Sequence, residues 1–188
     1  MALACRDYLE GNGVEVKLSR TTDENDALTE EIKECNNFNP TLAVDIHNNA
    51  GGGDGFEVFH SVSGGIGQIL AKNIEDEVKR LGQNSRGIKI RKNSRGKDYY
   101  GFIRSTVCPA VIVEGVFVDN ATDVKIADTI AEQKAFGYAY ARGILKTLGL
   151  EDKTVGSKPV EKPVEAPKPA KKSIDTVARE VISGKWGN

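Results

Sequence analysis

The sequence predicts an α/β fold: a single domain with a twisted, mostly parallel sheet flanked by helices on both faces. Three observations predict it. Segments with helical periodicity alternate with short runs of aliphatic and β-branched residues over the first 150 positions. Several of these runs, such as 110–113, are apolar at every position, as strands buried on both faces are. The helical segments between them supply the crossovers that parallel pairing requires.

The elements follow in order from local patterns. Helices are expected where apolar residues recur at helical spacing, in the ranges 2–10, 26–38 and 65–81, and one or two more are expected within 122–148. Asn25 or Asp26 is expected to cap the second of these helices. Strands are expected where aliphatic or aromatic residues alternate or form short runs, in the ranges 14–18, 41–46, 56–59, 88–90, 101–104 and 110–113. The glycine-containing runs 11–13 and 51–55 predict turns.

The composition changes after residue 150, which predicts the domain organisation. Residues 151–172 contain four of the six prolines of the chain among Lys, Glu, Val and Ala, as an extended linker without a packed core does. Residues 173–188 regain helical periodicity but are too few to fold alone. We therefore expect one domain over 1–150, a flexible linker over 151–172, and the start of a further unit over 173–188.

Charge and composition exclude several classes of protein. With 26 basic and 27 acidic residues the net charge is −1, whereas binding of nucleic acid requires a strongly basic face. No apolar run approaches the ~20 residues that span a bilayer, and no secretion signal is recognisable. The three cysteines are widely spaced without a CxxC pair, which predicts buried free thiols and not a zinc finger.

The candidate chemistry lies at the predicted ends of two strands. His47 follows the strand at 41–46, and Glu114 follows the strand at 110–113. Histidine is the commonest metal ligand, and glutamate is the usual proton carrier beside a metal-bound water. In an open α/β sheet such residues meet at the carboxyl edge. The alternative for His47 is a structural role as a loop cap; Glu114 would be costly to bury without a partner.

Four other features have both structural and functional interpretations. Asp45 is expected on the opposite face of its strand from His47, as a cap or loop partner and not a co-ligand. His60 is expected to be an exposed strand-end histidine or a substrate contact. The glycines of 51–55 lack the pattern of a phosphate-binding loop, and a backbone that passes close to a substrate explains them equally well. The basic segment 86–97 is a solvated loop or a contact for an anionic polymer.

Three motifs resemble, in order and spacing, those of zinc-dependent N-acetylmuramoyl-L-alanine amidases, the peptidoglycan hydrolases of bacteria and phage lysis systems. They are DIHNNA at 45–50, GFEVFHS at 55–61 and PAVIVEGVFVDN at 109–120. The resemblance extends over about residues 2–150, and the fold of that family, a single α/β domain, agrees with the prediction above. Residues 173–188 resemble the start of a cell-wall-binding repeat found at the C-terminus of some phage lysozymes.

The resemblance implies zinc as cofactor, peptidoglycan (glycan strand and stem peptide) as partner, and action on the bacterial cell wall as an endolysin or autolysin. It implies that His47 is a zinc ligand and that Glu114 is the catalytic glutamate. Glu114 would take a proton from zinc-bound water and pass it to the amine of L-alanine as its amide bond to muramic acid breaks. Asn49, Gly52 and His60 are expected to contact the substrate.

The sequence departs from the family pattern at its start. Family members begin with a strand that ends in a Gly-His-Gly-type motif with the first zinc ligand, and a glutamate ligand follows near the start of the first helix. This sequence begins within that helix, so the first strand and two zinc ligands are expected to be missing. A non-catalytic cell-wall-binding fragment is the alternative that this departure leaves open.

Overall fold

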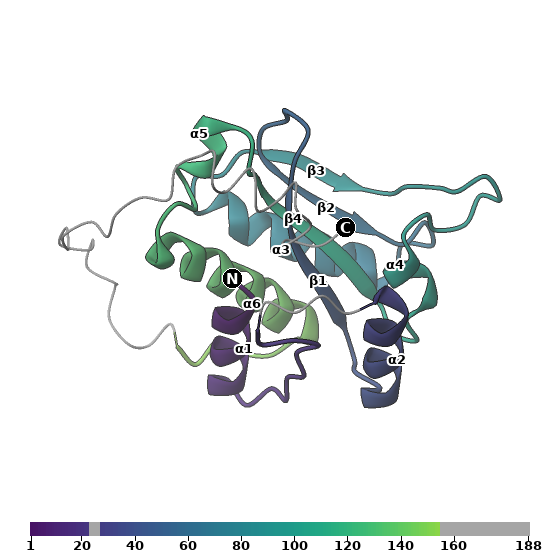
Figure 1. The fold of residues 1–188 in the computed structure, drawn as a ribbon. Helices are drawn as coiled ribbons and strands as arrows, with labels where there is room; N and C mark the ends of the chain where they lie inside the picture. Colours follow the sequence, from purple (N-terminus) through teal and green to yellow (C-terminus); the bar gives the residue numbers. More distant parts are fainter. Residues whose placement is uncertain (23–26, 155–188) are drawn as a thin grey trace.

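The structure, a computed structural model, describes residues 1–22 and 27–154. Figure 1 shows one twisted sheet with helices packed around it. Asn25, Asp26, most of the predicted linker and the predicted unit at 173–188 lie outside the described residues. Among the described helices, none combines the length and the apolar character needed to span a bilayer.

The described residues form a four-stranded sheet with the order β1-β4-β2-β3. The strands are β1 (Ala43–Asn49), β2 (Phe56–His60), β3 (Ser85–Lys89) and β4 (Ala110–Phe117). β1 pairs parallel with β4, and β2 pairs parallel with β3. The central pair, β4 with β2, is antiparallel. The predicted α/β fold with a mostly parallel sheet is confirmed.

Helices cover both faces of this sheet. In the described part they are α1 (Ala2–Gly11), α2 (Leu28–Phe38), α3 (Ile66–Lys79), α4 (Gly101–Ser105), α5 (Ala121–Val124) and α6 (Ile130–Leu148). α6 packs against both α1 and α3, and these three helices share one hydrophobic core with β2 and β4 (Figure 1). Thr129 and Glu132 form a capping box that begins α6, and Gly149 ends it in the left-handed conformation.

The other face of the sheet, called the polar face below, carries ionisable side chains beside apolar ones such as Phe59 and is partly covered by α2 and α4. The ring of Tyr100, the residue before α4, lies 4.9 Å from the ring of Phe59 on β2. Glu31 of α2 lies near enough to His47 of β1 for its charge to act on the imidazole. The two faces therefore differ in kind: one is an apolar core, and the other holds ionisable side chains.

Two predicted strands are wrong. Residues 14–18 are not part of the sheet, because a strand exists only where a neighbour pairs with it and no described strand lies beside this segment. The backbone N–H of Val14 instead donates to Leu9 O and helps to end α1. Residues 101–104 lie in α4 and form a helix, because four residues are too few to separate the two periodicities.

Two strands also continue past their predicted ends. β1 runs on to Asn49 and β4 to Phe117, so His47 and Glu114 lie inside strands and not just beyond them. The polar residues after His47 and the glycine after Glu114 do not end the strands, because each strand still has a neighbour to pair with. The register of β1 against β4 shifts between His47 and Asn49, so the regular pairing is interrupted just after His47 and Glu114.

The first residues after position 150 fold back onto α1. The hydroxyl of Tyr8 donates to Asp152 at 2.7 Å, and the backbone N–H of Lys153 donates to Asn12 Oδ1 at 2.7 Å. These bonds hold residues up to 154 against the domain. The remainder of the predicted linker, residues 155–172, lies outside the described residues, and the linker there stays a prediction.

Replacing Gly143 with alanine should lower the free energy of unfolding by about 1–3 kcal/mol, because α6 approaches α3 closely there. A Cβ at this position would lie 2.7 Å from Ile74 Cα. Gly11, at the end of α1, has nothing within 4 Å of an added Cβ and provides the control. Gly11→Ala should stabilise by about 0.4–1 kcal/mol. Urea unfolding measures both, and equal effects of the two substitutions would contradict the close approach of the helices.

Candidate active site

Three ionisable side chains form a row across the polar face of the sheet. In the register of the strands, His47 of β1 is the partner of Glu114 of β4, and Glu114 is the partner of Glu57 of β2. Residues paired across neighbouring strands share a face, so the three side chains lie beside one another. The structure thus brings together the two predicted candidates and adds Glu57, which the sequence analysis did not select.

His47 is held by a carboxylate on its own strand. Its Nε2 donates to Asp45 Oδ1 at 2.9 Å, and both side chains are about a quarter to a third exposed, at 24% for Asp45 and 32% for His47. The expectation that Asp45 points to the opposite face is wrong, because residues two positions apart in a strand share a face. The hydrogen bond to Asp45 raises the pKa of His47 and leaves the lone pair of the neutral ring on Nδ1.

Glu114 lies between the other two members of the row and is incompletely paired. Its Oε2 atom is buried and has no hydrogen-bond partner among the described residues. Burial raises the pKa of Glu114 to about 7, the positive charge of His47 opposes the shift, and Asp45 and Glu57 add to it. A carboxyl with this pKa exchanges a proton readily near neutral pH.

The residue after Glu114, Gly115, leaves little room for a side chain. A Cβ on Gly115 would lie 2.8 Å from the hydroxyl oxygen of Tyr140 and 2.9 Å from Asn48 Oδ1. The backbone of β4 therefore lies close to α6 at this point and to the neighbouring strand β1. This close packing fixes the strand segment from which the Glu114 side chain projects.

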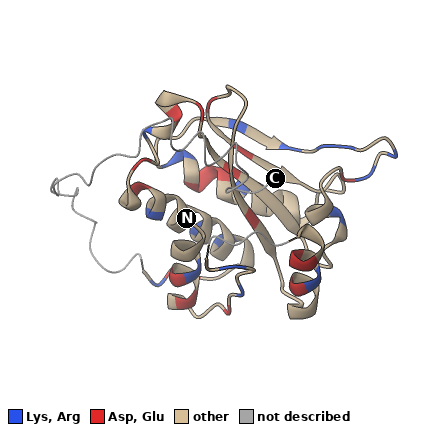
Figure 2. Cartoon of the chain, in the orientation of Figure 1, with Lys and Arg blue, Asp and Glu red and all other residues tan. Residues whose placement is uncertain are grey.

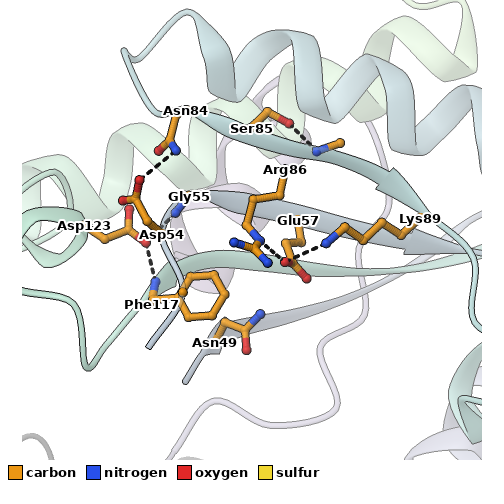
Figure 3. Close-up of polar contacts among 12 residues, drawn as sticks. Asn49, Asp54, Gly55, Glu57, Asn84, Ser85, Arg86, Lys89, Phe117 and Asp123 are labelled. Atoms are coloured by element: carbon orange, nitrogen blue, oxygen red, sulfur yellow. Dashed lines mark hydrogen bonds and ion pairs between the residues drawn. The ribbon is translucent and has the colours of Figure 1, made fainter. Parts of the chain in front are cut away.

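Glu57 is paired with two cations from β3. Figure 3 shows Arg86 and Lys89 converging on its carboxylate, and the distance from Lys89 Nζ to Glu57 Oε1 is 2.7 Å. Burial alone would raise the pKa of Glu57, but the hydrogen bonds from Lys89 and Arg86 outweigh it and lower that pKa. The sequence contained a signal for this residue: a glutamate inside an apolar strand is costly to bury without a partner.

Two aspartates attach the glycine turn to the segment after β4: Asp119 lies in the loop that follows the strand, and Asp123 lies in α5. Asp123 accepts hydrogen bonds from the backbone N–H groups of Gly55 at 3.0 Å and Phe117 at 2.6 Å (Figure 3). Asp119 Oδ2 accepts from Gly51 and Gly52, both at 2.8 Å. Because their N–H groups already have a carboxylate partner, these glycines do not form a phosphate cradle.

The three predicted substrate contacts lie in different places. Asn49 ends β1, where its side chain accepts a hydrogen bond from the backbone N–H of Ala50 at 2.9 Å. Gly52 is exposed in the turn that follows β1. His60 is the register partner of the buried Val111, so it lies on the face opposite to His47. It is 6% exposed, and the expectation of an exposed strand-end histidine is therefore wrong.

His60 instead lines a shallow, open cavity on the helix side of the sheet. Its Nδ1 lies 2.8 Å from the backbone oxygen of Ser61, to which the ring N–H donates. The other cavity residues come from the loop after β2, from α3 and from the end of β3 and are Val62, Ser63, Gly64, Gln68, Ile88 and Ile90. The structure therefore does not bring His60 together with the row.

The donor set of the row does not amount to a zinc site. A catalytic zinc has three protein ligands and a water. Residues 1–22 and 27–154 contain no group of three or more His, Cys, Asp or Glu side chains arranged to hold a metal. His47 and Glu114 lie together, but the described residues do not complete a ligand set around them.

Comparisons with known proteins agree on one family. A profile of N-acetylmuramoyl-L-alanine amidases matches residues 1–146. The amidase CwlM of Bacillus licheniformis is 31% identical over 152 residues, which cover 79% of this chain and 58% of that protein. The endolysin of Bacillus phage SPP1 is 31% identical over 154 residues, covering 78% of this chain and 54% of that protein. The chain thus spans a little over half the length of these relatives.

Solved structures share the fold. Cwp6 from Clostridium difficile superposes with a TM-score of 0.77 and 34% identity, covering 78% of this chain and 24% of that one. The catalytic domain of the amidase CwlV from Bacillus (Paenibacillus) polymyxa var. colistinus has a TM-score of 0.71 and 25% identity, covering 80% of this chain and 82% of that one. The similarity therefore extends over nearly all of the described domain.

The raised pKa of Glu114 predicts that metal-free protein loses stability as pH rises. The unfolded chain has the ordinary value of 4.5 and the folded chain a value of about 7, so the folded state binds more protons between these values. The free energy of unfolding should fall over this window by up to about 3 kcal/mol. The raised pKa of His47 acts in the same direction above pH 6.5.

Glu114→Gln should remove the larger part of this loss. Urea unfolding at several pH values between 5 and 8, in buffer with a chelator, compares the variant with the natural sequence. The variant should be the more stable of the two above pH 7, and the difference should shrink toward pH 5. Parallel pH profiles for the two proteins would contradict the assignment of the raised pKa to Glu114.

Proposed function

Because this chain belongs to the N-acetylmuramoyl-L-alanine amidase family, whose members act on the cell wall, we propose that it hydrolyses the amide bond between N-acetylmuramic acid and L-alanine in peptidoglycan. The observation that supports this most strongly is Glu114, whose buried Oε2 lacks a partner among the described residues and whose pKa is raised to about 7. A carboxyl with that pKa can accept a proton and return it at neutral pH.

The proposed roles follow from the row. Glu114 takes a proton from the attacking water and delivers it to the nitrogen of the departing L-alanine. Asp45 holds the ring of His47 through Nε2, and Nδ1 is then available to a metal or to the substrate. Asn49 and Gly52, at the end of β1 and in the turn after it, are proposed to contact the substrate on the same side.

Zinc is the cofactor that is typical of this family and is proposed here with His47 as a ligand. When bound in such sites, zinc polarises a carbonyl and lowers the pKa of its water. Among the described residues, three metal ligands are not present around His47. A second candidate function is binding to the cell wall without hydrolysis, which the exposed positive charges of the segment after β3 would support.

A basic hairpin is proposed to contact the carboxylates of the stem peptide. It follows β3 and is closed by the bridge between Lys92 and Asp98; Figure 2 shows the positive charges along it. Lys92, Arg95 and Lys97 are exposed. Arg91 lies over the ring of Tyr99, at 3.8 Å from its centroid. This cation–π contact lies where the two strands of the hairpin join the domain. Attraction between such charges and an anionic polymer weakens with salt.

Glu114→Gln should lower the rate of wall hydrolysis by about 10²–10⁴-fold, because it removes the proton carrier. His60→Gln is the control, since His60 lies on the opposite face of the sheet and should leave the rate unchanged. The measurement is the release of dye-labelled fragments and of new L-alanine amino groups from purified walls, with the zinc content of each protein determined by elemental analysis. A natural chain that contains no zinc and pellets with walls without releasing fragments would support the wall-binding alternative.

Replacing Lys92, Arg95 and Lys97 together with glutamine should weaken the pelleting of the protein with walls at low ionic strength. The difference from the natural chain should vanish at about 1 M salt, where charge attraction is screened. A charge-matched control replaces exposed lysines away from the hairpin, namely Lys125, Lys134 and Lys146. Equal loss of binding in both triple variants would show an effect of net charge alone and would count against contact through the hairpin.

A further inference from the structure

Two thiols meet where the C-terminal half of α2 passes the segment that leads into β4. Cys35 lies on α2, and Cys108 lies two residues before β4. Both are half-buried free thiols, and they lie close enough together for each to affect the pKa of the other. Cys5, the third cysteine, is a free thiol at 5% exposure in the core. The prediction of free thiols is thus correct for all three cysteines, whereas the prediction of burial is correct for Cys5 and only partly correct for the other two.

Backbone and side-chain contacts hold these two segments together independently of the thiols. Asn36, next to Cys35, donates through Nδ2 to Ser105 O at 3.0 Å and accepts through Oδ1 from the N–H of Val107 at 2.9 Å. On the other side of Cys108, the N–H of Ala43 donates to Pro109 O at 3.0 Å. The residues next to both cysteines are therefore held in place, so the fold keeps the two thiols close together.

We propose that Cys35 and Cys108 are a redox site that forms a reversible intramolecular disulfide by exchange with a small-molecule disulfide, RSSR. The thiolate of Cys35 attacks one sulfur of RSSR, which forms a mixed disulfide and releases RS⁻. The thiolate of Cys108 then attacks Cys35 Sγ, and the second RS⁻ departs. Each cysteine proton reaches one RS⁻ through the solvent, so two cysteine thiols are oxidised while RSSR is reduced to two RSH.

The environment of the thiols indicates the order of these steps. Burial raises the pKa of both thiols, and the rise is larger at Cys108, whose pKa reaches about 11. The thiolate is the attacking species, so Cys35 is the first nucleophile and Cys108 resolves the mixed disulfide. For Cys5, burial raises the pKa to about 12, and the core shields it from reagents.

The disulfide would fix α2 beside the row on the polar face. Glu31 and Cys35 are four residues apart and lie on the same side of the helix. Besides Asp45, whose hydrogen bond is the main cause, Glu31 contributes to the raised pKa of His47. A covalent bond between Cys35 and Cys108 therefore links the helix that places this charge to the segment that leads into Glu114. This inference does not depend on hydrolysis of peptidoglycan.

The test exposes the folded, fully reduced chain to oxidised glutathione at about pH 8.5, where the thiolate fraction is larger. We expect the number of free thiols to fall from three to one, the intact mass to fall by two hydrogens, and the protein to stay monomeric. Peptide mapping should find residues 35 and 108 in the bond, and dithiothreitol should restore three thiols. The melting temperature of the oxidised protein should rise by several degrees, because the bond closes a long loop in the unfolded chain.

Single variants separate this site from general thiol oxidation. Cys5→Ser should lose two thiols as the natural chain does, whereas Cys35→Ser and Cys108→Ser should form no internal bond and show no rise in melting temperature. Cys35→Ala and Cys108→Ala repeat the test in case a buried hydroxyl disturbs folding. A disulfide that includes Cys5, covalent dimers, or glutathione retained on both Cys35 and Cys108 would overturn the proposal.

Discussion

The register of β4 between its two neighbouring strands determines which side chains enter the core and which form the row on the polar face. In this register Val111 and Val113 are fully buried beneath α3 and α6, while Glu114 lies between His47 and Glu57. A shift of one residue would move Glu114 into the core and Val113 out of it. The burial of apolar side chains on one face of β4 therefore fixes the positions of the ionisable side chains on the other face.

Within the row, the two glutamates behave differently because their partners differ. Glu57 has two cations from β3, which keep its carboxylate charged and tie β2 to β3. Glu114 has no cation of that kind, and the negative charges of Asp45 and Glu57 add to the effect of its burial. Removal of either cation would leave the buried charge of Glu57 less compensated. Because that charge contributes to the raised pKa of Glu114, the two cations also affect Glu114.

Most of the elements that sequence alone predicts are those whose apolar residues build the core; α2 is the exception, because none of its residues is buried. The helix over 65–81, the helices within 122–148 (α5 and α6) and the strand over 110–113 are predictable in this way, and the motif residues His47 and Glu114 lie on strands that are predictable too. Contacts between distant strands have no such repeating pattern. The pairing of Glu57 with cations of β3 depends on how β2 and β3 align, and the length of each strand depends on the neighbour that it finds.

The buried acids of the domain show why one of them is the candidate for chemistry. Glu75 and Glu77 on α3 pair with lysine or arginine side chains, Asp123 accepts backbone N–H groups, and Glu57 has its two cations. Each of these contacts offsets the free energy of burying a charge, and each holds two segments or two turns of a helix together. Among the described residues only Glu114 keeps a buried side-chain polar atom without a hydrogen-bond partner. A native fold retains such an atom at a net loss of stability, so its presence beside His47 argues for a role in binding or proton transfer and not in structure.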